Sequence, residues 1–266
     1  MRFEKIELEC EGAYIDAYVA DPTKKFTRKA MLVIPGGGYG SVCSDREGEP
    51  IAQAFIPYGY NAFVLHYHVD REKPFPIQLI QATKAIKYIK DNAEDLGIDP
   101  EQLYVVGFSA GGHLAACTGV MWKMPELYEA VQMSYGYNKP KGVILIYPVI
   151  NNHAGSFRNL LCTPEPTEEM LEKVLVDRHV DADSAPAFIM HTSNDGVVDV
   201  RNSLSLAAAY RAAGLTFEMH IYPDAPHGSA LCNCITSGAN PKFENSSIAE
   251  WVRLAATWAD ALPDNI

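Results

Sequence analysis

Short, uninterrupted apolar runs alternate with helical patterns along most of this chain. The apolar runs cover residues 30–34, 61–69, 103–108, 142–148, 187–193 and 216–223. Helical patterns occupy residues 77–97, the stretch directly after 108, and about 200–213 and 246–261. Strands that are apolar along their whole length are buried on both faces, and intervening helices connect them in parallel. The sequence therefore predicts an α/β fold, with a mostly parallel central sheet and helices on both faces.

Two segments depart from this alternation of strand and helix patterns. Residues 1–29 alternate apolar and polar side chains around a turn near Gly12, which is typical of an antiparallel pair at a sheet edge. Residues 149–185, called the insertion below, contain no strand pattern and one short helical pattern with Thr167 as its N-cap. Seven acidic and two basic side chains fall within 159–183. We expect a lid-like insertion in a single domain that spans 1–266.

The charge balance argues against several classes of partner. The chain has 22 Lys and Arg against 33 Asp and Glu, a formal net charge of −11, and no basic run. Such a chain is repelled by nucleic acid and by anionic membrane surfaces. We expect a cytoplasmic location with reduced thiols, because the N-terminus has no secretory pattern and the six cysteines are scattered. Cys232 and Cys234 lack a partner pair at zinc-site spacing, so no metal is expected.

The motif Gly107-Phe108-Ser109-Ala110-Gly111-Gly112 follows an apolar run and opens a helical pattern. A nucleophile elbow requires this context, since only small residues fit beside so sharp a turn, which lifts the serine hydroxyl above the sheet. A serine is a poor nucleophile without a base, and His227 lies in a turn-rich loop after the last strand pattern. For the other seven histidines a structural role is the default expectation. The backbone N–H of Ala110 would be one donor to an oxyanion, and the glycine-rich loop 35–40 would supply the other.

Three aspartates are candidates for the acid that orients His227. Asp195 is the best of them, because its loop leaves the carboxyl end of the strand beside the one that bears His227. Asp199 is better placed to start the next helix, where the dipole favours a carboxylate. Asp224 lies only three residues before His227. The acid would hold the imidazole tautomer and stabilise the imidazolium.

Together these motifs resemble the α/β-hydrolase superfamily, near its hormone-sensitive-lipase-like carboxylesterases. The closest likeness is to the acetyl-xylan-esterase-like branch of bifunctional feruloyl/acetyl esterases. The matching pieces include PGGGYG, KPFP, DLGIDPEQLYVVGFSAGGHLAA, HTSNDGVVDVRNSLSLAAAYRAAG and HIYPDAPHG. The resemblance implies an α/β-hydrolase fold that needs no cofactor, with Ser109, Asp195 and His227 as the catalytic triad and Gly37, Gly38 and Ala110 as oxyanion donors.

The implied activity is hydrolysis of short acyl esters, with acetylated xylo-oligosaccharides or similar sugars as the small-molecule partner. The acidic, polar insertion agrees with this, since it has no long apolar stripe to hold a lipid chain and would repel anionic substrates. An amidase or formamidase with the same triad, and a non-catalytic ligand-binding protein, remain alternatives. The oligomeric state is not predicted. Four aromatic residues are candidate sugar-stacking surfaces, with core packing an equal alternative: Tyr39, Tyr67, Tyr147 and Phe157.

Overall fold

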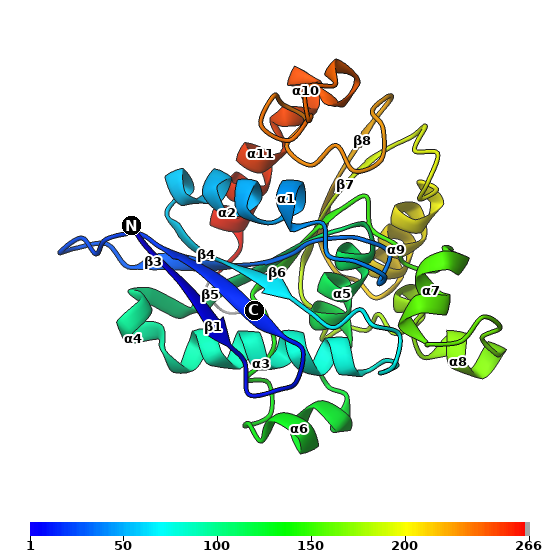
Figure 1. Cartoon of the computed structure of the whole chain (residues 1–266), viewed down its shortest axis with the longest axis horizontal. Coiled ribbons are helices and arrows are strands. Elements are labelled where there is room, and N and C mark those ends of the chain that lie inside the picture. The colour runs from blue at the N-terminus through cyan, green and yellow to red at the C-terminus, as the bar shows by residue number, and fades with distance from the viewer. Residues whose placement is uncertain (264–266) are drawn as a thin grey trace.

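The computed structural model describes residues 1–263, which are built around an eight-stranded sheet (Figure 1). Its strands lie in the order β1-β2-β4-β3-β5-β6-β7-β8. Their bounds are Arg2–Glu7 (β1), Tyr14–Val19 (β2), Arg28–Ile34 (β3), Tyr60–His66 (β4), Ile98–Phe108 (β5), Gly142–Ile146 (β6), Ala187–Thr192 (β7) and Phe217–Tyr222 (β8). Neighbours from β4 to β8 run parallel, while β1 and β2 form an antiparallel edge. The predicted parallel sheet and its antiparallel edge pair are confirmed.

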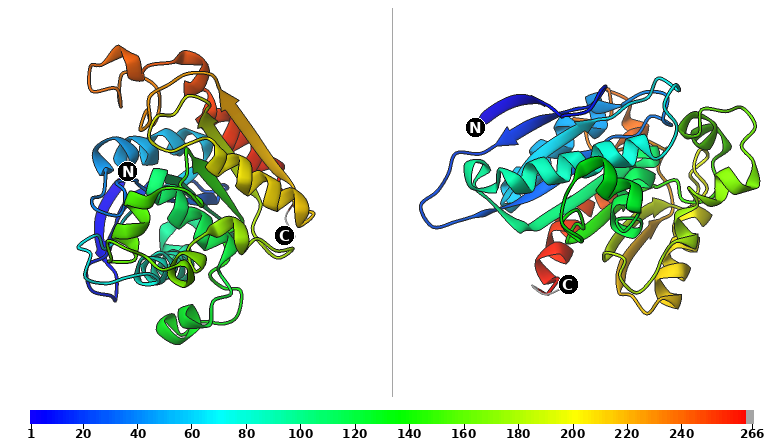
Figure 2. Two further views of the ribbon diagram at one scale, coloured as in Figure 1. Left: turned by 90° about the vertical axis from the view of Figure 1, so that its right-hand side faces the viewer. Right: turned by 90° about the horizontal axis from the view of Figure 1, so that it is seen from below.

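Helices cover both faces of this sheet, as the two layers in Figures 1 and 2 show. One core cluster packs α3 (Ile77–Asp91), α5 (Ser109–Val120) and α9 (Arg201–Ala212) against the sheet. The other cluster contains side chains of α2 (Glu49–Phe55) and α11 (Trp251–Ala261). Every residue of β6 and β7 is buried, which explains why β6 and the first four residues of β7 are apolar without alternation. Within residues 1–263, no helix combines the length and the apolar character needed to cross a membrane.

The smaller helices lie in the connections. Their bounds are Ser44–Glu47 (α1), Ala93–Leu96 (α4), Pro125–Val131 (α6), Ala154–Leu160 (α7), Glu168–Glu172 (α8) and Ser246–Ala249 (α10), with 3₁₀ turns at Ile56–Tyr58, Val176–Arg178 and Pro241–Phe243.

The insertion folds onto the main body through α7, α8 and the 3₁₀ turn Val176–Arg178. Thr167 caps α8 by accepting a hydrogen bond from Met170 N at 3.2 Å, as the sequence predicted. Helix α7 was not predicted, because its N-cap is His153, whose Nδ1 accepts from Ser156 N, rather than one of the usual capping residues. Several apolar side chains of the insertion join the core cluster that contains α5: Phe157, Leu160, Val174 and Val176.

Candidate active site

Ser109 lies at the junction of β5 and α5, with a backbone φ of +52°. A non-glycine residue rarely adopts this left-handed conformation, and it persists only where the surroundings fix it. The flanking glycines show how tightly the turn is packed. An ideal Cβ on Gly107 would lie 2.2 Å from the Gly111 carbonyl oxygen, and one on Gly111 would lie 2.2 Å from the Ile34 oxygen. Only glycine fits at either position, so the elbow is enforced by sterics.

The structure brings Ser109, His227 and Asp195 together at the carboxyl ends of β5, β8 and β7. His227 Nε2 lies 2.9 Å from Ser109 Oγ, and His227 Nδ1 lies 2.7 Å from Asp195 Oδ2. A carboxylate only accepts hydrogen bonds, so Nδ1 carries the imidazole proton and Nε2 is free to accept from the serine hydroxyl. This is the geometry of a nucleophile paired with a general base that a buried acid orients.

Asp195 is held by a second set of contacts on its own loop. Its Oδ1 accepts hydrogen bonds from the backbone N–H groups of Val197 and Val198, each at 2.9 Å. His191 Nε2 lies 3.4 Å from Oδ2. Burial alone raises the pKa of Asp195, but the hydrogen bonds from His191 and His227, the His227 charge and the Val197 N–H outweigh burial and hold the pKa below its usual range. The carboxylate therefore stays ionised beside His227.

The other two candidate acids face elsewhere. Asp199 accepts from the backbone N–H of Arg201 at 2.8 Å and pairs with its guanidinium at 2.6 Å. Hydrogen bonds from Arg201 lower the pKa of Asp199 to about 2. Asp224 accepts a hydrogen bond from the side-chain amide of Asn194. Of the three aspartates, Asp195 is the one that contacts His227.

The glycine-rich loop passes directly beside Ser109, since an ideal Cβ on Gly36 would lie 3.0 Å from Ser109 Cβ. Gly37 and Gly38 have φ values of +128° and +62°, which favour glycine. In the part of the chain that the structure describes, the amides of these two residues donate no hydrogen bond. Ala110 is the second residue of α5, where a backbone N–H has no intrahelical acceptor. The structure thus brings the loop that carries Gly37 and Gly38 beside Ser109 and Ala110.

The four aromatic residues proposed as sugar-stacking surfaces lie in the core instead, which corrects that part of the sequence analysis. Tyr39 and Tyr67 are 2% exposed, and Tyr147 and Phe157 are 3% exposed. No ring face is left for a ligand. The sequence did not show which side of each loop faces the interior.

These aromatic side chains fix the loops around Ser109. The Tyr67 hydroxyl donates to the Pro35 carbonyl at 2.8 Å, at the start of the glycine-rich loop. The Tyr39 hydroxyl lies 2.7 Å from Nδ1 of His113, on whose ring Phe157 packs edge to face at 5.6 Å between centroids. Packing and hydrogen bonding, rather than ligand contact, explain their positions.

Comparison with known proteins places this architecture in a family. The model of the BD-FAE family matches residues 15–210. The chain belongs to the BD-FAE family. Its acetyl ester-xyloside bifunctional hydrolase neighbour, from Caldicellulosiruptor lactoaceticus, superposes with a TM-score of 0.80 at 31% identity, over 94% of this chain and 88% of that one. The α/β-hydrolase fold is shown by the sheet order and by a second structural relative, the alpha/beta hydrolase enzyme MGS-M1 from a Medee basin deep-sea metagenome library, which superposes with a TM-score of 0.80 at 33% identity over 98% of each chain.

Two curated relatives are longer than this BD-FAE chain. Endo-1,4-beta-xylanase B of Butyrivibrio fibrisolvens is 38% identical over 218 residues, which make up 77% of this chain and 33% of that protein. Acetylxylan esterase of Xylanibacter ruminicola is 27% identical over 212 residues, 75% of this chain and 41% of that protein. The chain thus spans less than half the length of either.

One buried carboxylate near the site was missed by the sequence analysis. Glu47 is 2% exposed, on the short helix α1 that follows the glycine-rich loop. Nothing in the sequence distinguishes Glu47 from its acidic neighbours Asp45 and Glu49, which are both exposed. The burial of Glu47 depends on contacts with residues distant in the sequence, such as Tyr147.

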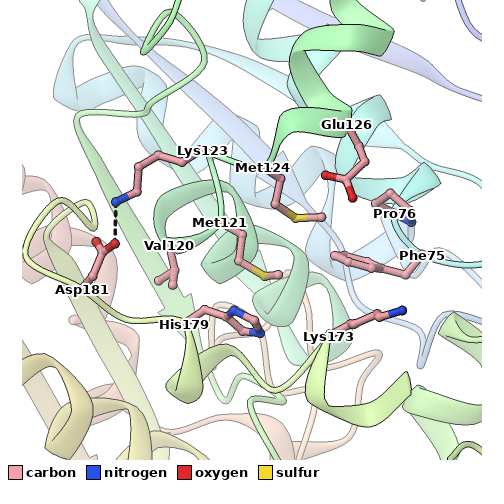
Figure 3. A pocket seen from close by; sticks show the side chains of 10 residues that line it. All are labelled: Phe75, Pro76, Val120, Met121, Lys123, Met124, Glu126, Lys173, His179 and Asp181. Carbon is pink, nitrogen blue, oxygen red and sulfur yellow. Dashed lines mark hydrogen bonds and ion pairs between the residues drawn. The ribbon is translucent and has the colours of Figure 1, made fainter. Parts of the chain in front are cut away.

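A cavity of about 510 Å³ lies at the other end of α5 from Ser109 (Figure 3). Helix α5 rises for about 16 Å between Ser109 and Val120, so this cavity is separate from the triad. Figure 3 shows Lys123 reaching across to Asp181 at one side. The lining combines apolar and charged side chains: Phe75, Pro76, Val120, Met121, Lys123, Met124, Glu126, Lys173, His179 and Asp181.

The neighbouring cysteines of this BD-FAE chain, Cys232 and Cys234, lie in different environments. Cys232 is buried and Cys234 is exposed. Among residues 1–263, no group of three or more His, Cys, Asp or Glu side chains is arranged to hold a metal ion.

Proposed function

We propose that this chain is a serine carboxylesterase that removes short acyl groups, principally acetyl, from xylo-oligosaccharides or similar sugars. One observation carries the proposal: His227 lies within hydrogen-bond distance of both Ser109 Oγ, at 2.9 Å, and Asp195 Oδ2, at 2.7 Å. A histidine that bridges a serine and a buried carboxylate beside two glycine amides is suited to acyl transfer.

The proposed reaction proceeds through an acyl-enzyme. Ser109 Oγ attacks the ester carbonyl carbon while His227 Nε2 takes the hydroxyl proton. The amides of Gly37, Gly38 and Ala110 would stabilise the oxyanion. His227 then protonates the leaving alcohol as the tetrahedral intermediate collapses. A water molecule releases the acyl group in the second half, with His227 again acting first as base and then as acid.

The acetyl-sugar substrate is supported by the names of two relatives and by the acidic side chains of the insertion. Two of the relatives above are named as an acetylxylan esterase and an acetyl ester-xyloside hydrolase. The insertion carries seven acidic side chains within 159–183, a surface unsuited to a long lipid chain or to an anionic substrate. An acetylated sugar is neutral and rich in hydroxyl groups, and it has no long lipid chain, so this surface is compatible with it.

The test is hydrolysis of p-nitrophenyl acetate, butyrate and octanoate, together with acetate release from acetylated xylo-oligosaccharides. Wild type, Ser109→Ala and the control Ser247→Ala, which alters an exposed serine on α10, would be compared. We expect fast acetate release by wild type and by the control, and none by Ser109→Ala. Full activity of Ser109→Ala would overturn the triad. A preference for octanoate would discard the sugar substrate, and cleavage of amides alone would indicate an amidase.

A further inference from the structure

Glu47 accepts hydrogen bonds from two different parts of the site. Its Oε2 accepts from the backbone N–H of Gly36 at 2.8 Å, and its Oε1 accepts from the Tyr147 hydroxyl at 2.9 Å. We propose that Glu47 is a positioning residue that fixes the oxyanion loop through Gly36 and the catalytic histidine through Tyr147. This inference rests on the proposed function. Glu47 does not contact the reacting atoms, so it acts through the groups it holds.

The first arm of this arrangement fixes the loop. Gly36 lies between Glu47 and the nucleophile, since an ideal Cβ on Gly36 would be 2.8 Å from Glu47 Oε2 and 3.0 Å from Ser109 Cβ. With its N–H directed to Glu47, Gly36 sets the orientation of the next two peptide groups. Those peptide groups carry the Gly37 and Gly38 amides proposed to bind the oxyanion. Pre-oriented donors of this kind stabilise a transition state most when they do not have to reorganise.

The second arm reaches the histidine. The Tyr147 hydroxyl donates to Glu47 and accepts from the backbone N–H of Ala230 at 3.0 Å. The Tyr147 ring packs against the His227 imidazole, with 4.8 Å between centroids. Tyr147 and Ala230 both have left-handed backbones, with φ values of +39° and +48°. Such conformations persist where surrounding contacts determine them, and Glu47 anchors the side chain that joins the two residues.

The chemistry of the two partners selects a carboxylate at position 47. Gly36 N–H and Tyr147 O–H are both donors toward it, and an ionised carboxylate only accepts. A glutamine amide has one accepting oxygen in place of two, so it cannot accept from both Gly36 N–H and Tyr147 O–H in the present geometry. Burial raises the pKa of Glu47 above its ordinary value, and the two hydrogen bonds and the charges of Arg46 and His227 offset only part of that rise. A negative charge here also favours the imidazolium form that His227 adopts during acyl transfer.

The experiment compares Glu47→Gln with Glu49→Gln, an isosteric change at an exposed glutamate two residues away on α2. Two quantities are measured: kcat and KM for p-nitrophenyl acetate, and the rate at which a fluorophosphonate labels Ser109. For Glu47→Gln we expect kcat and the labelling rate to fall about 10²-fold with KM almost unchanged, the pattern of an interaction realised in the transition state. Glu49→Gln should match wild type. Retention of the wild-type kcat and labelling rate by Glu47→Gln would overturn the inference.

Tyr147→Phe supplies a second, independent test, and it serves alone if Glu47→Gln does not fold. This variant keeps the ring against His227 but removes the hydroxyl that contacts Glu47. We expect it to lower kcat by itself, and the effect of Glu47→Gln to be smaller in the Tyr147→Phe background than in wild type. Fully additive losses would refute the histidine arm, and so would wild-type kcat in Tyr147→Phe.

Failure of the proposed function gives a different result. If wild type hydrolyses no ester and Ser109 is not labelled, the serine esterase proposal fails, and with it the role of Glu47. If wild type is active and labelled, equal labelling rates in wild type and Glu47→Gln refute the positioning role alone.

Discussion

The hydroxyl of Tyr39 lies 2.7 Å from Nδ1 of His113, inside the core beneath the glycine-rich loop. His113 Nε2 lies 2.7 Å from the Val174 carbonyl oxygen. A carbonyl only accepts, so Nε2 carries the proton, and Nδ1 accepts from the Tyr39 hydroxyl. One neutral imidazole therefore connects the glycine-rich loop, helix α5 and the insertion.

This buried imidazole predicts that folding stability falls in mild acid. Burial lowers the pKa of His113 to about 4 from the ordinary value of 6.5. Between these two pH values the unfolded chain binds a proton that the folded chain excludes, so the free energy of unfolding falls as pH decreases from 6.5 to 4. The full loss is roughly 3 kcal/mol. Urea unfolding across this window measures it, and His113→Gln should flatten the dependence relative to wild type. An unchanged pH dependence in that variant would contradict the prediction.

Asp195→Asn should lower kcat far more than Asp199→Asn. The amide at position 195 no longer holds the His227 tautomer, and loss of such an acid costs about 10⁴-fold in kcat. Asp199 pairs with Arg201 at the surface, and exposed pairs of this kind contribute little. Steady-state kinetics on p-nitrophenyl acetate decide between them. A larger loss in Asp199→Asn would reverse the assignment of the acid.

Gly111→Ala should destabilise the protein severely, because the new methyl group would lie 2.2 Å from the Ile34 carbonyl oxygen and 2.3 Å from that of Pro35. Backbone cannot move aside as a flexible side chain can, so we expect a cost of about 3 kcal/mol or more. Gly155→Ala is the control, since its Cβ would meet only His153, at an ordinary 3.5 Å, and alanine favours a helix such as α7. Thermal unfolding of both variants gives the answer, and equal melting temperatures would refute the steric account of the elbow.

Tyr67→Phe should weaken the anchor of the glycine-rich loop. The variant removes the hydroxyl that donates to the Pro35 carbonyl at 2.8 Å and leaves that buried oxygen without this donor. A loss of about 1–3 kcal/mol in stability is expected, accompanied by a lower kcat. Tyr58→Phe, at a residue that is 41% exposed, is the matched control. If the two variants melt at the same temperature, the hydrogen bond of Tyr67 contributes nothing.

The strands and the Ser109, His227 and Asp195 cluster follow from local sequence patterns. A strand buried on both faces, such as β6, must be apolar throughout, and this is visible without tertiary information. The three site residues each follow a strand, and parallel strands bring their carboxyl ends to one edge. Proximity of the three residues could therefore be predicted before any distance was known.

The roles of Glu47 and of the four aromatic residues could not be predicted from local sequence patterns. Their roles depend on whether a loop side chain turns inward, and that is decided by contacts with residues distant in sequence. Tyr147 contacts Glu47 across 100 residues, and Tyr39 contacts His113 across 74. Helix α7 was missed for a related reason, because an imidazole supplies its N-cap.

The insertion is fastened to the main body by buried apolar side chains and, in addition, by backbone atoms that nearly every amino acid carries. Its Val174 and Leu160 carbonyls accept from His113 and from the Phe75 amide, and its Ala185 amide donates to the Gly119 carbonyl. The backbone attachments do not depend on which side chains the segment exposes to solvent. Mutations of the solvent-exposed residues of the insertion can therefore accumulate without breaking these attachments. The surface of this segment is free to diverge over evolutionary time while the Ser109, His227 and Asp195 cluster stays intact.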